Sequence, residues 1–252
     1  MKKIIVTSAK GGIGKSTVAL GLAAALSRAG HPTLLVDCDV GNRCIDLMLG
    51  LQDEVLFDLD DVAAGRCTPE EALLTPADLP NLRVTAAPLH QDSPHDRIDA
   101  LCRLALAAGA EFVLCDTAGT GNLVRKIASD FAEGALVIAT QQPASIRAAE
   151  RTALLMEEMG ALPCRLVISM FEEYAARDGV RAGLLEIIDK SHLRTIGVVP
   201  RDRSLLLSQE SGQLPSEKSR AARAFKNIAT RLTGEEIPLF FGIREIKTAK
   251  VL

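Results

Sequence analysis

The chain has 252 residues, 48% of them hydrophobic and 24% charged, which is enough for one α/β domain with a large core. Its formal net charge of −3 excludes a global positive field that would draw it to DNA or acidic lipid, so such contacts require a local patch. Aromatic residues make up only 3%, which argues against a base-stacking platform.

The six cysteines and four histidines show no spacing that is typical of a metal site or a disulfide framework. We therefore expect reduced thiols that pack as small hydrophobes, and no zinc site. The sequence shows no signal peptide, and no apolar stretch approaches the roughly 20 residues of a membrane-spanning helix. These features predict a cytoplasmic protein.

Short β-branched runs alternate with Ala/Leu-rich helical patterns along the whole chain. Strands are expected at Lys2–Thr7, Thr33–Asp37, Leu82–Ala86, Phe112–Asp116, Ala135–Thr140, Arg165–Ser169 and Thr195–Val199. Helices are expected at Ser16–Arg28, Arg97–Ala108, Ile146–Met159 and Glu217–Leu232. The acidic, turn-rich segment Leu51–Pro80 is predicted to be a loop with short helices. This alternation predicts an α/β fold with a mostly parallel, doubly wound sheet and helices on both faces, in a single domain over residues 1–252.

A glycine-rich run at residues 8–17 follows the first expected strand and opens a helix. Its central backbone N–H groups can curl around phosphate oxygens, and the helix N-terminus adds a favourable dipole. These are the groups of Gly11, Gly12, Ile13 and Gly14. Lys15 matches the lysine that reaches the β- and γ-phosphates of a P-loop, and Ser16 matches the hydroxyl that binds Mg²⁺. Thr17 can donate to the α-phosphate.

Three acids are expected at the same edge of the sheet as this loop. Asp37 and Asp39 come at the carboxyl end of the second strand, and Asp116 ends a buried strand as a Walker B carboxylate does. An Asp at a strand end is often only a turn former, but three beside a phosphate loop predict an Mg²⁺ site together with Ser16. Gly119 can offer its N–H to the γ-phosphate.

Lys10 adds a second lysine ahead of the loop, and Ala9 takes the place of the first glycine of the ordinary pattern. With these features, residues 10–17 resemble the signature of the MinD/ParA family of deviant Walker A ATPases. The runs Asp37–Gly50, Ile196–Asp202 and Arg231–Glu236 are similar to the branch of that family that places the cell-division site. The resemblance spans nearly the whole chain.

The resemblance implies an ATP- and Mg²⁺-dependent ATPase that forms a homodimer on binding ATP and acts as a positioning switch with a regulatory protein partner. It implies that Lys10 reaches the nucleotide of the other subunit, that Asp39 positions the attacking water and that Asp116 supports Mg²⁺. Lys10, Lys15 and Asp39 are therefore the expected catalytic residues.

The base site is also predicted from the resemblance. Pro200, Arg201 and Asp202 would flank the adenine, and Ser169 stands where the family usually has an Asn that reads the adenine edge. Cys44 likewise replaces an Asn that is common in the segment after the second strand. Both positions depart from the family's pattern.

Three other functions stay open at this point. A ParA-like partitioning ATPase would bind DNA as a dimer, and cations on the helix Glu217–Leu232 could serve it or could simply be solvated. They are Lys218, Arg220, Arg223, Lys226 and Arg231. A metal-cluster carrier that shares the loop would need paired cysteines, for which Cys67 and Cys102 offer no context. A ligase of the dethiobiotin-synthetase kind also couples this fold to ATP.

The tail, residues 240–252, has two competing interpretations. Family members of the cell-division branch end in an amphipathic helix that inserts into the bilayer surface, and three basic residues here could attract anionic lipid. These residues are Arg244, Lys247 and Lys250. However, the apolar residues spread around a helix axis and give no clean face. The alternative to peripheral contact at the inner face of the cell membrane is a tail packed on the domain through Phe240 and Phe241.

Overall fold

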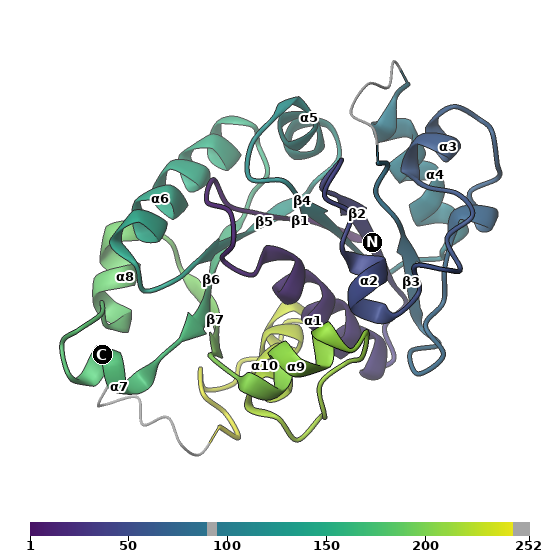
Figure 1. Ribbon diagram of the computed structural model, residues 1–252. Coiled ribbons are helices and arrows are strands. Elements are labelled where there is room, and N and C mark those ends of the chain that lie inside the picture. Colours follow the sequence, from purple (N-terminus) through teal and green to yellow (C-terminus); the bar gives the residue numbers. More distant parts are fainter. Residues whose placement is uncertain (90–94, 244–252) are drawn as a thin grey trace.

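The computed structural model describes residues 1–89 and 95–243, and its centre is a parallel β-sheet (Figure 1). Within these residues the sheet has seven strands in the order β3-β2-β4-β1-β5-β6-β7, and every pair of neighbours runs parallel. The strands are β1 (Lys2–Thr7), β2 (Thr33–Cys38), β3 (Leu82–Thr85), β4 (Phe112–Thr117), β5 (Gly134–Ala139), β6 (Cys164–Phe171) and β7 (Thr195–Pro200). All seven expected strands are therefore confirmed.

The helices alternate with these strands along the chain. They are α1 (Lys15–Arg28), α2 (Ile45–Leu49), α3 (Leu59–Ala63), α4 (Arg97–Ala107), α5 (Asn122–Asp130), α6 (Pro143–Glu158), α7 (Glu173–Arg177), α8 (Leu184–Ser191), α9 (Arg203–Glu210) and α10 (Arg220–Leu232). The segment Leu51–Pro80 is a loop with α3 and a short 3₁₀ turn at Glu70–Ala72, as predicted. The predicted start of the last helix at Glu217 is wrong: Ser219 accepts a hydrogen bond from the Ala222 amide and caps the helix there.

Helices cover both faces of the sheet, with α1 and α10 on one face and α4, α5 and α6 on the other (Figure 1). Alternate strand residues point to opposite faces. Along β1, Ile4 and Val6 belong to the core that includes α1 and α10, whereas Ile5 belongs to the core that includes α4 and α5. Since both faces are covered, the strands are apolar at nearly every position. The doubly wound fold predicted from the alternation is confirmed.

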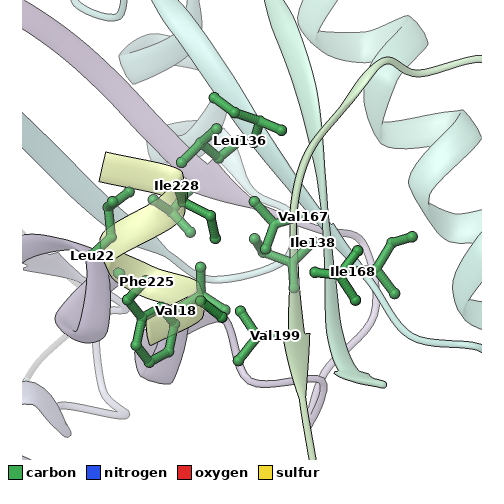
Figure 2. Packing of buried hydrophobic residues seen from close by; sticks show 14 of the residues in the cluster. Val18, Leu22, Leu136, Ile138, Val167, Ile168, Val199, Phe225 and Ile228 are labelled. Atoms are coloured by element: carbon green, nitrogen blue, oxygen red, sulfur yellow. The ribbon is translucent and has the colours of Figure 1, made fainter. Parts of the chain in front are cut away.

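The helices α1 and α10 pack closely on each other. Figure 2 shows Val18 and Leu22 of α1 gathered with Phe225 and Ile228 of α10 against strands β5, β6 and β7. A Cβ atom built on Gly21 of α1 would lie 2.3 Å from the Phe225 ring. Glycine at position 21 therefore allows the Phe225 ring to rest directly on the backbone of α1.

The polar side of α10 holds the chain that follows it. Arg231 donates to the carbonyl of Pro238 (2.6 Å), Asn227 donates to that of Phe241 (2.8 Å) and Arg223 to that of Gly242 (3.1 Å). Arg223 therefore holds the start of the tail and Arg231 holds the segment just before it, so the alternative of a simply solvated basic face does not describe these two cations.

The tail packs on the domain, but through a different pair of side chains from the one predicted. Phe240 and Ile243 are buried, whereas Phe241 is 60% exposed, so the prediction of packing is confirmed for Phe240 and wrong for Phe241. The predicted lipid-binding residues at 244–252 lie outside the described residues. None of the helices in the described ranges has the length and apolarity needed to span a membrane.

Candidate functional site

Parallel pairing places the carboxyl ends of β1, β2 and β4 next to one another. Val6 of β1 pairs with Asp116 of β4, which in turn pairs with Asp37 of β2. The glycine-rich loop leaves β1 at this edge and enters α1. Two of the acids predicted from strand ends are thus beside the loop, where open α/β sheets bind their ligands.

The loop uses backbone conformations that glycine adopts without strain. Gly12 and Gly14 have φ angles of 70° and 84°, in the left-handed region that side chains disfavour. Gly14 is the N-cap residue of α1, and the first turn of the helix then presents Lys15, Ser16 and Thr17. Because the first amides of a helix have no partner within it, this turn can bind an anion.

Gly119 lies so close to the loop that a side chain would collide with it. A Cβ atom built on Gly119 would lie 2.6 Å from the carbonyl oxygen of Ser8. On another side of the loop, the Ala9 amide donates to Thr152 Oγ1 of α6 at 3.0 Å. The loop is therefore held between the segment after β4 and α6, and Gly119 is next to it, as its predicted role requires.

Asp116 is fully buried, and neither of its carboxylate oxygens has a hydrogen-bond partner among the described residues. Burial raises the pKa of Asp116 to about 7; Asp37 and Asp39 act in the same direction, while Ser16 and Lys15 oppose it. A buried carboxylate without a partner is costly. It is an expected feature of a site that is completed by a cation and its water.

Asp37 is equally buried, but both of its oxygens have partners. It accepts hydrogen bonds from the amides of Asp39 (3.0 Å), Cys44 (3.0 Å) and Ile45 (3.2 Å). Burial raises the pKa of Asp37, and these hydrogen bonds act against that shift. Asp37 thus ties the segment before α2 to the end of β2, which favours Asp116 as the carboxylate that would support Mg²⁺.

The segment between β2 and α2 carries two further residues of the predicted site. Asp39 is partly exposed and accepts a hydrogen bond from the Asn42 side chain at 3.2 Å. Burial raises the pKa of the Cys44 thiol to about 12, and Ser16 is among the groups that interact with it. The replacement of the family's Asn therefore puts a protonated, neutral thiol beside the hydroxyl predicted to bind Mg²⁺.

The donor set fits an Mg²⁺ ion that is held partly by a nucleotide. Within residues 1–89 and 95–243, no three His, Cys, Asp or Glu side chains are grouped so that they could hold a metal ion. Mg²⁺ in nucleotide sites keeps several waters and takes one or two protein groups together with phosphate oxygens. Ser16 and the unpaired Asp116 suit that arrangement, with Asp37 and Asp39 as neighbours.

The side chain of Lys10 contacts the start of α6. Its Nζ donates to the side-chain oxygen of Gln142, the N-cap residue of α6, at 2.7 Å. In the described part of the chain Lys10 takes part in no ion pair, so its charge is not neutralised by a carboxylate. A small cavity of about 100 Å³ adjoins it and is lined partly by Gly11, Gly12 and Ile13.

A larger cavity, of about 840 Å³, is lined by residues of β6, β7, α7 and α9. It is large enough for a small-molecule ligand. The structure brings all the residues predicted to contact the base to its wall, with Thr17 of the loop. They are Ser169, Pro200, Arg201 and Asp202.

Strand β6 contains a β-bulge next to both cavities. The pairing of β6 with β7 shifts register after Ile168, and Met170 takes a φ of 52°. Met170 lines both cavities. A Cβ atom on Gly14 would lie 3.1 Å from Ser169 Oγ, so the bulge brings Ser169 against the end of the phosphate loop.

Two of the predicted nucleotide contacts are engaged with other parts of the protein. Thr17 Oγ1 donates to Gln209 of α9 at 3.3 Å. Asp202 caps α9 by accepting from the Ser204 amide (2.9 Å), and it also accepts from the Ala221 amide (3.1 Å). Burial raises the pKa of Asp202, but the hydrogen bond from the Ser204 hydroxyl (2.7 Å) and those from the amides outweigh it and lower the pKa overall. Asp202 therefore shapes the cavity as a helix cap.

Four polar residues of this region were not predicted. Gln141 and Gln142 follow β5, and Glu172 follows β6, so they occupy the same strand-end position that marked the aspartates. Their position at the end of a strand is the sequence signal that could have identified these three residues. Arg181 lies between α7 and α8 and carries no such signal.

These features define a P-loop nucleotide-binding protein: a glycine-rich loop between β1 and α1, a lysine and a hydroxyl in the first helical turn, and acids at the neighbouring strand ends. The CobQ/CobB/MinD/ParA nucleotide binding domain matches residues 4–215, and the chain therefore belongs to that family.

Within the family, the chain is similar to septum site-determining proteins. It is 31% identical to MinD of Synechocystis sp. over 93% of this chain and 90% of that protein, and 30% identical to MinD of Bacillus subtilis over 94% and 90%. Its fold is similar to MinD in the MinC:MinD cell division complex of Aquifex aeolicus (TM-score 0.86, 28% identity, covering 95% and 98% of the two chains). A plasmid partition protein of Borrelia burgdorferi shares the fold with a lower TM-score of 0.74, at 20% identity and over 92% and 98% of the chains.

Proposed function

We propose that this chain is an Mg²⁺-dependent ATPase that dimerises when it binds ATP and helps to place the cell-division site. The observation that carries the proposal is the buried Asp116 carboxylate, unpaired within the described residues and next to Asp37 at the mouth of the phosphate loop. The similarity to septum site-determining proteins over more than nine-tenths of the chain supports the cellular process.

The proposed chemistry is positioning and electrostatic stabilisation. The loop amides and Lys15 bind the phosphates, Ser16 and Asp116 would hold Mg²⁺, and Asp39 orients the attacking water. The bound Mg²⁺ would neutralise charge on the phosphate oxygens. Lys10, without an ion-pair partner in the described structure, supplies its charge to the nucleotide of a second copy.

Because hydrolysis is coupled to dimerisation in this proposal, the bound nucleotide determines whether the protein is a monomer or a dimer. The segments after Asp39 and Asp116 would change position with the state of the γ-phosphate. We propose a regulatory protein partner as well; the Aquifex aeolicus neighbour was solved as a MinC:MinD complex. The protein would be cytoplasmic, with weak peripheral contact at the inner face of the cell membrane.

The first test is nucleotide binding by calorimetry. Lys15→Ala should abolish ATP binding, because Lys15 supplies the point charge at the end of the loop. Lys190→Ala is a matched control, since Lys190 is an exposed lysine that pairs with Glu186 on α8. Unchanged ATP affinity in Lys15→Ala would contradict the proposed site.

The second test separates dimerisation from hydrolysis by sedimentation with ATP. Lys10→Ala should bind ATP as a monomer and fail to hydrolyse it. Asp39→Ala should accumulate as an ATP-bound dimer, because water positioning is lost while the phosphate contacts remain. A normal ATP-dependent dimer of Lys10→Ala, or full turnover of Asp39→Ala, would refute the corresponding role.

The third test identifies the target by measuring ATPase activity alone, with anionic vesicles and with duplex DNA. We expect stimulation by vesicles, lost on deletion of residues 244–252; Ile243 is kept in that truncation because it is buried in the core. Stimulation by DNA that weakens steeply with salt would instead support a partitioning ATPase.

A further inference from the structure

Two arginines share one buried carboxylate at the edge of the phosphate loop. Arg201 Nη1 donates to Glu172 Oε1 at 2.7 Å, and Arg181 Nη1 lies 3.2 Å from Glu172 Oε2. Burial acts to raise the pKa of Glu172, but the hydrogen bond from Arg201 and the charge of Arg181 lower it overall. Glu172 is therefore ionised, and Arg181 and Arg201, the arginine pair, are held side by side.

The position of Glu172 is fixed by the protein backbone. Gln141, fully buried at the end of β5, accepts from the Glu172 amide at 2.7 Å and donates to the Ala182 carbonyl at 3.1 Å. The Arg201 amide donates to the Phe171 carbonyl at 2.9 Å. The chain is thus anchored at the ends of β6 and β7, while the Arg201 side chain is 66% exposed and can turn toward a ligand.

The arginine pair faces the phosphate loop. Both arginines line the 100 Å³ cavity together with Lys10, Gly11 and Gly12. Arg201 also lines the 840 Å³ cavity, so it stands between the loop and the proposed base site. A nucleotide that occupied both the loop and the larger cavity would pass its phosphate chain beside Arg201.

The charges around the small cavity are unbalanced. Its lining contains three cations, and Glu172, the carboxylate that pairs with two of them, carries one negative charge. A guanidinium has five N–H donors, and Glu172 takes only part of that capacity. The planar fork of an arginine matches the oxygens of a phosphate.

We propose that Arg181 and Arg201 bind the polyphosphate of the nucleotide, and that Glu172 holds them in place and competes with the phosphates for them. The inference rests on the proposed function and deepens it, because it assigns Arg201 to the phosphates instead of the adenine and adds Arg181. Both are positioning residues, and the ligand class is a nucleoside triphosphate or another chain of linked phosphates.

Calorimetry with three probes tests the inference: ATP, inorganic tripolyphosphate and adenosine. Arg201→Ala should weaken the binding of ATP and of tripolyphosphate by about tenfold or more, as for the loss of one charge-assisted hydrogen bond, and leave adenosine binding unchanged. Arg201→Lys should recover part of the loss. The matched control is Arg66→Ala, which removes an exposed arginine paired with Asp61 away from the site.

A role limited to neutralising Glu172 gives a different pattern. In that case Arg201→Ala would lower the melting temperature and either leave tripolyphosphate affinity like that of Arg66→Ala or weaken all three probes equally. Either result overturns the inference. If Arg201→Ala does not fold, Arg181→Ala decides, because it should weaken tripolyphosphate binding and leave adenosine binding unchanged, and a tripolyphosphate affinity like that of Arg66→Ala would overturn the inference. Glu172→Gln tests the competition: tripolyphosphate binding should tighten several-fold, and weaker or unchanged binding would refute it.

The two proposals fail separately. If the unmodified chain binds neither ATP nor tripolyphosphate, the proposed function is wrong and the inference falls with it. If it binds both with Lys15-dependent affinity while Arg201→Ala and Arg181→Ala behave like the control, the proposed function stands and the arginine pair has no phosphate role.

Discussion

The free energy of unfolding should fall as the pH rises from about 4 to about 7, and Asp116 is the residue responsible. Burial raises its pKa from 3.8 to about 7. Above 3.8 the unfolded chain ionises freely, whereas the folded protein keeps the proton until about 7. Stability is therefore lost as the pH rises, and the loss is complete above the folded pKa. Each tenfold difference in proton affinity between the folded and unfolded states is worth about 1.4 kcal/mol. The full loss of stability is therefore about 4 kcal/mol, and about 2 to 3 kcal/mol of it falls between about pH 5 and pH 8.

The variant Asp116→Asn removes this titration while nearly keeping the shape of the side chain. Denaturant unfolding of both proteins, with EDTA and without nucleotide, should give a stability difference that grows by about 2 to 3 kcal/mol in favour of the variant from about pH 5 to pH 8. Groups that do not interact with Asp116 titrate alike in both proteins and cancel in the difference. Asp189→Asn, at an exposed position in α8, should show no such growth. A difference for Asp116→Asn that does not change with pH would refute the reasoning.

Three further predictions concern the loop, the base site and the tail. Gly119→Ala should lower kcat/KM of ATP hydrolysis by roughly a hundredfold in steady-state assays, because the added Cβ displaces the loop at Ser8; near-normal turnover would contradict the close approach. Ser169 offers one hydroxyl that can donate or accept, so GTP should bind within about tenfold of ATP. Ser169→Asn should favour ATP in competition assays, and a large preference for ATP in the unmodified chain would argue against this reasoning. Arg231→Ala should speed amide hydrogen exchange in residues 237–243, since it loses the Pro238 contact; unchanged exchange would show that this contact is not needed.

The strands and the phosphate loop could be predicted from sequence because their signals are local. A parallel strand covered on both faces is an uninterrupted apolar run, and a P-loop is a contiguous motif. Acids at strand ends could be expected beside the loop by the same logic, and the register places Asp37 next to Asp116. What each carboxylate bonds to was not predictable, because the partners of Asp37 are backbone amides of a segment without a regular pattern.

The wall of the base cavity has features that could not be predicted from the sequence. The bulge in β6 places Met170 in a left-handed conformation, which the sequence does not signal with a Gly or Asn at that position. Arg181 meets Glu172 across a turn, and such a pairing depends on the tertiary path of the chain between α7 and α8. The short helices α2, α5, α7, α8 and α9 were not predicted, and the start of α9 is set by the Asp202 cap.

The helix α10 bears on the choice between DNA and membrane as the target. Its apolar side packs on α1, whose first turn is the proposed phosphate site, through the contact of Phe225 with Gly21. Its polar side holds the chain at Pro238, Phe241 and Gly242. Two of the five cations that could have met DNA are thus used to hold the segment that leads into the tail. The same helix therefore joins the start of the tail to the nucleotide site through packed contacts, an arrangement better suited to presenting a tail than to displaying a free basic surface.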